Sequence, residues 1–287
     1  MPYLDQLQKR LGAAWPAIMK ARDEAGQMEY DLCLLLASGN ERLDQPDTSI
    51  VVFGSLARGE WTSGSDVDWT LLIDGSANPE HHTNAVRIEQ RLRSKYNAPG
   101  QTGVFGNMAF SHQIIHQIGG QDDTNRNTTH RILLLLESLA IGDDDAHNRV
   151  LTATLQRYLE GDVSFVNGLG GNTVPRFLLN DIVRFWRTVA VDFAAKQRDR
   201  SGTGWGLRNA KLRMSRKLIF AAGLLICFDC HLNRPPTLDG AQRPSAERPM
   251  IWLEFLKQRV LETPLEIVSR FLYGQEFSLR AGTPRFL

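Results

Sequence analysis

The sequence has few cysteines and no long uninterrupted apolar run. Its three cysteines, Cys33, Cys227 and Cys230, are too few for a disulfide framework, and free thiols are typical of a reducing compartment. The longest apolar stretches, residues 132–136 and 218–228, are too short or too interrupted to span a bilayer. The first residues also lack the basic and apolar regions of a secretory signal. We therefore expect a cytoplasmic protein with no membrane partner.

The chain also has almost no net charge. Thirty-three Lys and Arg residues against 32 Asp and Glu residues give a formal net charge of +1, so the total charge neither favours nor excludes a polyanionic partner. The distribution is uneven, because residues 176–217 contain eleven basic and three acidic side chains. This segment is a candidate surface for phosphates or for an RNA backbone.

Composition and length are those of an ordinary globular protein. The 287 residues are 42% hydrophobic and 23% charged, and they suffice for one large domain or two modest ones. Apolar spacing predicts strands at residues 49–53, 66–73 and 107–118, with helices at residues 4–36, 56–60, 78–96, 129–139 and 147–159 and mainly helices after Pro175. We expect an α/β (α+β) fold with a small mixed sheet. The glycine-rich segment 168–171 is the predicted boundary between a core of residues 1–168, with N-terminal helices, and a helical domain of residues 172–287.

Asp66 and Asp68 stand one residue apart in a predicted strand. Side chains at i and i+2 of a strand point to the same face, whereas on a helix they do not, so both carboxylates can ligate one metal ion. A divalent cation held by carboxylates stabilises charge on a reacting phosphate. We therefore predict catalytic and metal-binding roles for Asp66 and Asp68.

The turn before this strand complements the two aspartates. Gly54 lets the backbone approach a phosphate closely, and Ser55 adds a hydroxyl beside the amides that open a short helix. A Gly-Ser turn or an Asp-x-Asp pair alone is common, but their combination predicts phosphate held from one side and a metal ion from the other.

The two parts together resemble a known signature. Residues 51–60, with the sequence VVFGSLARGE, followed by Ser65-Asp66-Val67-Asp68, resemble the Gly-Ser…Asp-x-Asp signature of the DNA polymerase β-like nucleotidyltransferase superfamily. The resemblance is close over residues 49–73. Residues 111–112 and 134–138 loosely resemble the PII uridylyltransferase-like branch.

The resemblance implies an enzyme that transfers a nucleoside monophosphate from a nucleoside triphosphate to an acceptor and releases pyrophosphate. It implies Mg²⁺ or Mn²⁺ as the cofactor and a helical domain that closes a nucleotide cleft. The acceptor is RNA, a protein, a small molecule or a second nucleotide, and the basic segment favours a macromolecule. A role as a toxin or in antiviral defence is also compatible with the superfamily.

Further site residues follow from the signature and from the basic helices. The predicted nucleotide-binding residues are Gly54, Ser55, Arg58, Ser65, Arg184, Lys211 and Lys217. Related enzymes usually supply a third carboxylate from a later strand, but residues 107–118 contain His112, Gln113 and His116 and no Asp or Glu. We assign Asp123 as the third metal ligand, with a solvent-exposed turn as its alternative and Gln113 as another occupant of the expected position.

Two other function classes compete with the enzyme. A missing third carboxylate is typical of a catalytically inactive nucleotide-binding module that regulates a partner. An RNA-binding adaptor would use the basic segment 176–217 alone, and its RNA affinity would fall steeply with salt.

Overall fold

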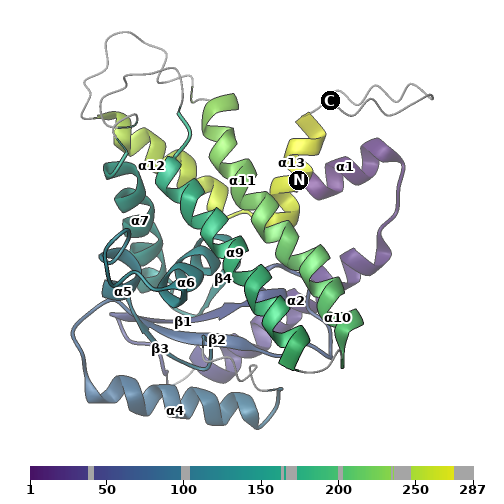
Figure 1. Cartoon of the computed structure of the whole chain (residues 1–287). Helices are drawn as coiled ribbons and strands as arrows, with labels where there is room; N and C mark the ends of the chain where they lie inside the picture. Colours follow the sequence, from purple (N-terminus) through teal and green to yellow (C-terminus); the bar gives the residue numbers. More distant parts are fainter. Residues whose placement is uncertain are drawn as a thin grey trace, which may run out of the picture.

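A four-stranded mixed sheet lies at the centre of the molecule. The computed structural model describes residues 1–37, 42–97, 104–162, 165, 173–199, 203–233, 235 and 247–274. The strand order is β3-β2-β1-β4 (Figure 1). β1 (Thr48–Phe53) pairs antiparallel with β2 (Asp68–Ile73) and β4 (Ser138–Ile141), and β3 (Asn107–Phe110) pairs parallel with β2. The small mixed sheet confirms the predicted fold class.

The sequence of β1 explains why it is the central strand. Its residues Ile50, Val51 and Val52 are β-branched, which favours an extended backbone, and every residue of the strand is buried. Because side chains alternate along a strand, Val51 and Phe53 enter one apolar cluster, whereas Ile50 and Val52 enter another on the opposite face. Both faces of the sheet are therefore covered.

Helices α2 (Pro16–Leu32) and α4 (Pro79–Arg93) cover one face, with the π-helical segment η1 (Cys33–Ala37) beside them. Figure 1 shows α4 below the sheet; we call this side the lower face. A proline at the first turn opens each helix, where its missing N–H costs nothing. The Asn78 side chain caps α4 by accepting from the backbone N–H of Glu80 at 3.0 Å.

The remaining helices follow the chain onto the other face, which we call the upper face. They are α5 (Ser111–Ile115), α6 (Asn125–Leu136), α7 (Asp145–Glu160), α9 (Arg176–Asp199), α11 (Lys217–Leu232), α12 (Arg248–Val260) and α13 (Pro264–Gly274), with α10 (Trp205–Lys211) and the π-helical segment η3 (Leu212–Arg216) preceding α11. Helix α1 (Tyr3–Leu11) packs against α13, so the first and last described helices lie side by side (Figure 1).

A single apolar cluster joins the sheet to the C-terminal helices. It runs from Val51 to Ile267 and contains residues of β1, α6, α7, α9, α11 and α12. The predicted boundary 168–171 lies outside the described residues, so the division into two domains stays a prediction. Within the described part of the chain, every helix is too short or too polar to cross a membrane.

One predicted element was partly wrong in type, and another was wrong in its end. The strand expected over residues 107–118 ends at Phe110 and continues as helix α5, in which the adjacent residues Ile114 and Ile115 are both buried. Neighbouring residues cannot both face one cluster from a regular strand. The helix expected to reach residue 139 ends at Leu136, because the residues that follow pair with the free edge of β1 as β4.

Candidate functional site

Asp66 and Asp68 face the upper helices. Val67 and Trp69 alternate with them and are buried on the lower face. Asp68 stands directly opposite Phe53 of β1, whose side chain belongs to the upper cluster. Because residues i and i+2 of an extended chain point the same way, both carboxylates project toward the upper side. β2 begins at Asp68, two residues later than the predicted strand, so Asp66 lies just before it, and both aspartates line one cavity.

The Gly-Ser turn lies directly against Asp68. Gly54 opens the short helix α3 (Gly54–Ala57) at the end of β1 and has a φ of +74°, a conformation that glycine adopts without strain. A Cβ atom at this position would lie 3.2 Å from Oδ2 of Asp68. The backbone of the turn therefore approaches the carboxylate closely, and Ser55 lines the same cavity.

A third carboxylate reaches the site from the junction between α6 and β4. The register places Ser138 opposite Phe53, so Glu137 stands one residue further along, beside Gly54. The Glu137 side chain is buried, lines the cavity and forms an ion pair with Arg58.

Sequence reasoning missed Glu137 because it assigned residues 129–139 to one helix. No local pattern marks Glu137, which follows the apolar run of residues 132–136. Its position depends on the pairing of β4 with β1, which joins segments about ninety residues apart. Among the described residues of β3 there is no Asp or Glu. β3 pairs with β2 in parallel, with Asn107 beside Thr70. Two residues earlier, the same register brings Phe105, and not a carboxylate, beside Asp68.

A cavity of about 550 Å³ lies between the sheet end and the upper helices. The turn and strand residues that line it are Gly54, Ser55, Arg58, Thr62, Gly64, Ser65, Asp66, Asp68, Val104 and Phe105. The remaining residues that line it are Thr129 and Leu133 of α6, Glu137 directly after α6, Phe185, Thr188, Val189, Asp192 and Lys196 of α9, and Leu207, Lys211, Ser215, Arg216 and Ile219 of α10, η3 and α11. This volume is within the range of small-molecule sites.

Negative charge is concentrated at the sheet end of the cavity. Burial, together with the nearby carboxylates of Asp66 and Glu137, raises the pKa of Asp68 to about 7, although Lys211 and Arg216 oppose the shift. Burial also raises the pKa of Glu137, although the Arg58 guanidinium beside it acts in the opposite direction. The site holds more like charge than its own cations offset, which favours binding of an added cation.

Two basic side chains of the segment formed by α10 and η3 line the cavity. Lys211 is the last residue of α10 and was predicted, whereas Arg216 at the end of η3 was not. π-helical turns inside longer helices often occur at functional sites. Here η3 connects α10 to α11 and carries Ser215 and Arg216 on the cavity.

Arg58 and Ser65 also line the cavity, but both have partners in the protein. The Nε atom of Arg58 donates to Glu60 at 2.9 Å, and its Nη1 binds Glu137. Ser65 Oγ accepts from the backbone N–H of Thr62 at 3.3 Å. These two residues therefore shape the loop between the Gly-Ser turn and the aspartates.

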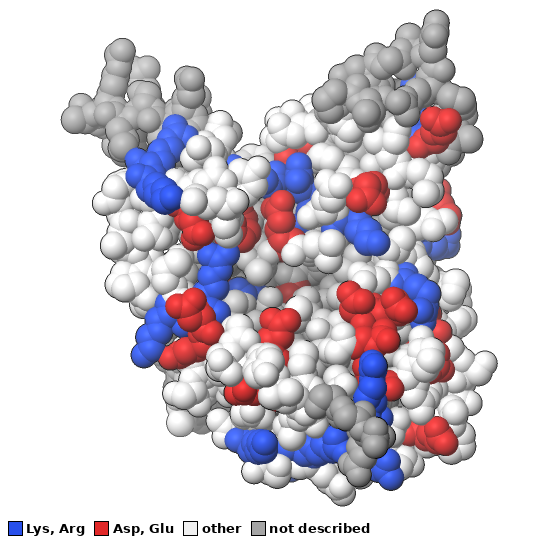
Figure 2. Space-filling view, turned by 180° about the vertical axis from the view of Figure 1, so that it is seen from behind, with Lys and Arg blue, Asp and Glu red and all other residues white. Residues whose placement is uncertain are grey.

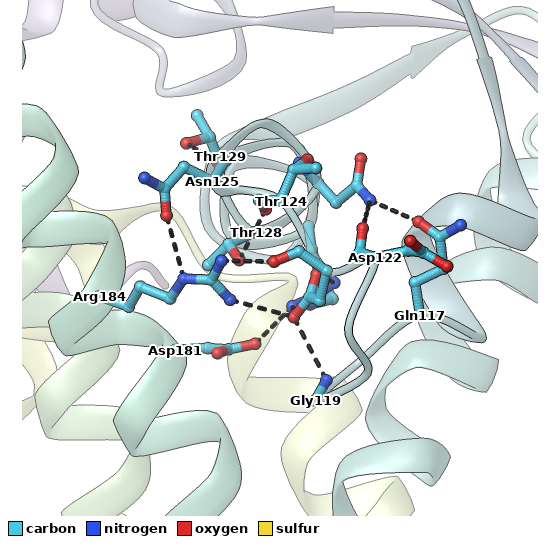
Figure 3. A network of polar contacts seen from close by, with 12 residues as sticks. Gln117, Gly119, Asp122, Thr124, Asn125, Thr128, Thr129, Asp181 and Arg184 are labelled. Atoms are coloured by element: carbon cyan, nitrogen blue, oxygen red, sulfur yellow. Dashed lines mark hydrogen bonds and ion pairs between the residues drawn. The ribbon is translucent and has the colours of Figure 1, made fainter.

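The assignment of Asp123 to the metal requires correction. Its carboxylate is buried and binds Arg131 at 3.0 Å and Arg184 at 3.1 Å. Arg184 also donates from Nε to Asn125 at 3.1 Å, and Figure 3 shows it reaching from α9 toward the start of α6, with Asp181 nearby. Neither Asp123 nor Arg184 is among the described residues that line the cavity. Both belong instead to an ion-pair network inside the helical layer.

Other basic residues of segment 176–217 are neutralised in the same way. Arg176 binds Asp162 at 2.9 Å, and Lys196 binds Asp192 at 2.8 Å. Lys217 is exposed and is absent from the described cavity lining, and Arg200 lies outside the described residues. Figure 2 shows that Lys and Arg lie interspersed with Asp and Glu on the face seen from behind. The excess of basic residues in the sequence therefore overstates the free positive charge.

The carboxylates fit a divalent metal ion. Asp66 and Asp68 offer hard oxygen ligands from one chain segment that lines the cavity. The pKa of Asp68 is raised first by burial and then by the neighbouring carboxylates of Asp66 and Glu137, whose negative charge a cation would offset. In the described part of the chain, no group of three or more His, Cys, Asp or Glu side chains is placed to hold a metal ion. One or two carboxylates suffice for Mg²⁺, which is commonly completed by substrate phosphates and water.

Comparison with known proteins supports the same segment. Residues 35–99 match the family model described as nucleotidyltransferase domain. No curated protein and no solved structure matches the chain. The loose resemblance of residues 111–112 and 134–138 to the PII uridylyltransferase-like branch stays a prediction. The matched segment holds the Gly-Ser turn, both aspartates and β2, and the match is consistent with the resemblance to the DNA polymerase β-like superfamily.

Proposed function

We propose that the chain is a metal-dependent nucleotidyltransferase that transfers a nucleoside monophosphate from a nucleoside triphosphate to an acceptor hydroxyl. The observation that carries this proposal is the closeness of Gly54 to Asp68 at the end of one cavity. A Gly-Ser turn and two carboxylates on one side, with Lys211 and Arg216 on the other, provide complementary groups for a triphosphate and a cation.

Each group has a role in the proposed reaction. The acceptor hydroxyl gives up its proton to solvent and its oxygen attacks the α-phosphorus. The bond to the bridging oxygen breaks, and pyrophosphate leaves with that electron pair. Mg²⁺ or Mn²⁺ held by Asp66 and Asp68 would neutralise charge on the phosphates. Gly54 and Ser55 hold the triphosphate in line, and Lys211 and Arg216 offset the charge that develops on pyrophosphate.

Arg58 and Glu137 have a positioning role in this proposal. Their ion pair connects the loop after the Gly-Ser turn to the start of β4, and both side chains line the cavity. Asp123, Arg184 and Lys217 are not part of the proposed site. Asp123 and Arg184 form an ion pair inside the helical layer, and Lys217 is exposed outside the described cavity lining. We propose a macromolecular acceptor, because the exposed residues Trp205 and Leu207 lie at the start of α10, and Leu207 lines the cavity.

The test uses the purified chain, Mg²⁺, α-labelled nucleoside triphosphates and a panel of RNA, protein and small-molecule acceptors. We expect label transfer with release of pyrophosphate, and loss of both in the Asp66→Asn/Asp68→Asn variant by at least about a hundredfold. Asp145→Asn on α7 is the matched control, because this carboxylate is exposed and is not part of the described cavity lining. Full activity in the double variant would contradict the proposal.

The same samples separate the enzyme from its closest rival. A nucleotide-binding regulatory module predicts saturable binding of triphosphate without any product, and binding that does not depend on Mg²⁺. Calorimetry with and without EDTA distinguishes the two, because the enzyme requires binding that weakens when the cation is removed.

A further inference from the structure

The part of the cavity beyond the aspartates is lined by apolar side chains and two threonines. Leu133 and Thr129 follow Glu137 back along α6 at intervals of four residues, so Thr129 lies roughly 12 Å from Glu137 along the helix axis. The contact of Arg184 with Asn125 joins α9 to α6 one turn before Thr188 and Thr129 respectively. In Figure 3, Thr129 points away from the ion-pair network that surrounds Arg184.

Apolar surface at this end suits the faces of an aromatic ring. Phe105 comes from the segment before β3, and Phe185 and Val189 come from one face of α9. Aromatic and aliphatic side chains pack favourably against a flat ring, and such packing does not discriminate among nucleobases. Discrimination therefore depends on the polar atoms at this end of the cavity.

Both threonine hydroxyls already use their only proton. Thr129 Oγ1 donates to the carbonyl oxygen of Asn125 at 2.7 Å, and Thr188 Oγ1 donates to the carbonyl oxygen of Arg184 at 3.0 Å. A hydroxyl that donates to the helix backbone keeps only acceptor lone pairs for a ligand. The two threonines therefore offer acceptors, not donors, to the cavity.

The side-chain donor on the same wall of α9 is Lys196, which lies two turns beyond Thr188 and is paired with Asp192 at 2.8 Å. Among the described lining residues nearer to the threonines, Val104, Phe105, Leu133, Phe185 and Val189 have no polar side-chain atom. The carbonyl oxygen of Val104 is engaged by Nε2 of His130 at 2.6 Å. Among these described residues, acceptor atoms of a ligand would find no hydrogen-bond donor beside the threonines. N–H groups of a ligand would instead donate to the two threonine oxygens.

We infer that the cavity selects a nucleobase with an exocyclic amino group, and that Thr129 and Thr188 are the residues that select it. This inference rests on the proposed function, since it places the base of the triphosphate at the threonine end. Adenine, cytosine and guanine each present an amino donor, whereas uracil presents carbonyl acceptors and a single ring N–H. One hydrogen bond made or lost changes affinity by about fivefold to tenfold.

The experiment measures Kd by calorimetry for ATP, CTP, GTP and UTP with Mg²⁺ on the full chain. It adds purine riboside triphosphate, which is ATP without its amino group, so that ring size and stacking stay constant. Thr129→Val and Thr188→Val remove the acceptors with little change of shape. Thr152→Val is the matched control, because Thr152 Oγ1 makes the same bond to the carbonyl of Asn148 at 2.7 Å and is not in the described cavity lining.

We expect ATP and CTP to bind about tenfold more tightly than UTP and than the amino-free purine. The double threonine variant should lose this difference, while Thr152→Val keeps it. Equal binding of ATP, UTP and the amino-free purine by the unmodified chain would overturn the inference and leave the proposed function intact. A preference that survives in the double variant would also overturn it. Failure of all triphosphates to bind the folded chain would overturn the proposed function itself, and the inference with it.

Discussion

At the scale of single residues, Gly54 is the position where backbone conformation and site geometry coincide. Replacing it with alanine adds strain at a φ of +74° and brings a methyl group to 3.2 Å from Oδ2 of Asp68. We expect Gly54→Ala to lose about 1–2 kcal/mol of the free energy of unfolding. Nucleotide transfer should fall by more than tenfold, because the Asp68 carboxylate has to shift from the position in which it would hold the metal ion.

Gly12 provides the control for this prediction. It has a φ of +60°, so alanine there has similar strain, but no described atom lies within 4 Å of its Cβ position. Gly12→Ala should therefore lose comparable stability, measured by urea unfolding, and keep full activity. If the two variants lose activity equally, the contact between Gly54 and Asp68 has no special role.

The sequence identified Gly54, Ser55, Asp66 and Asp68 because their relation is local. A strand, a tight turn and a second strand place them together over about fifteen residues, so periodicity and turn chemistry are sufficient. Glu137 and Arg216 enter the cavity only through pairing and packing of distant segments, which no local pattern records. Asp123 was misassigned because the sequence around an aspartate that follows a predicted strand does not show whether its carboxylate binds a metal ion or an arginine.

At the scale of elements, Arg131 connects three helices of the upper layer. It lies on α6, is fully buried, and binds Asp123 at 3.0 Å, Asp181 of α9 at 2.6 Å and the Tyr158 hydroxyl of α7 at 2.7 Å. Removing one member of a buried ion-pair network leaves uncompensated charge. We expect Arg131→Met to lower the free energy of unfolding by about 3–5 kcal/mol, as measured by urea unfolding.

A surface ion pair is the control for this network. Arg149 on α7 binds Asp74 at 2.7 Å, but its side chain is 49% exposed. Solvent screens such a pair, so Arg149→Met should cost less than about 1 kcal/mol. Similar losses in the two variants would show that the Arg131 network does not hold the three helices together.

The same comparison explains which elements the sequence predicted. α4, α6 and α7 form largely where apolar spacing indicated. α4 and α7 each bury one face of a sufficiently long helix, whereas α6 is buried on all sides over residues 130–136. β4 has only four residues, of which the first three are half-buried, so its alternation is too short to read. It becomes a strand because the free edge of β1 offers hydrogen-bonding partners along Ile50–Phe53.

At the scale of the whole molecule, His147 couples the helical layer to the sheet and makes stability depend on pH. It lies on α7, its backbone N–H donates to Ser49 of β1 at 3.1 Å, and its ring Nε2 is 2.8 Å from Ser138 Oγ of β4. The Ser138 hydroxyl donates to the carbonyl oxygen of Leu134 at 2.6 Å, so its oxygen accepts from Nε2 of a neutral imidazole.

Burial lowers the pKa of His147 to about 4, and nearby Asp144 only partly opposes this effect. In the unfolded chain the imidazole has an ordinary pKa of about 6.5. As the pH falls from about 6.5 to about 4, the His147 imidazole becomes protonated in the unfolded state but stays neutral in the folded state. The folded state therefore loses stability over this window. The loss from this one group reaches at most about 3 kcal/mol at pH 4 and is absent above pH 7.

Replacing His147 with glutamine should remove this component. Urea unfolding at pH 7, 5.5 and 4.5 measures it as the difference in slope between the unmodified chain and His147→Gln, because the other titrating groups are common to both. His82→Gln on α4 is the control, since this side chain is exposed. The unmodified chain and His82→Gln should lose stability more steeply below pH 6.5 than His147→Gln. Parallel curves for all three would mean that the imidazole takes up its proton equally well in the folded and unfolded states, and that the junction of α7 with β1 and β4 tolerates a charge.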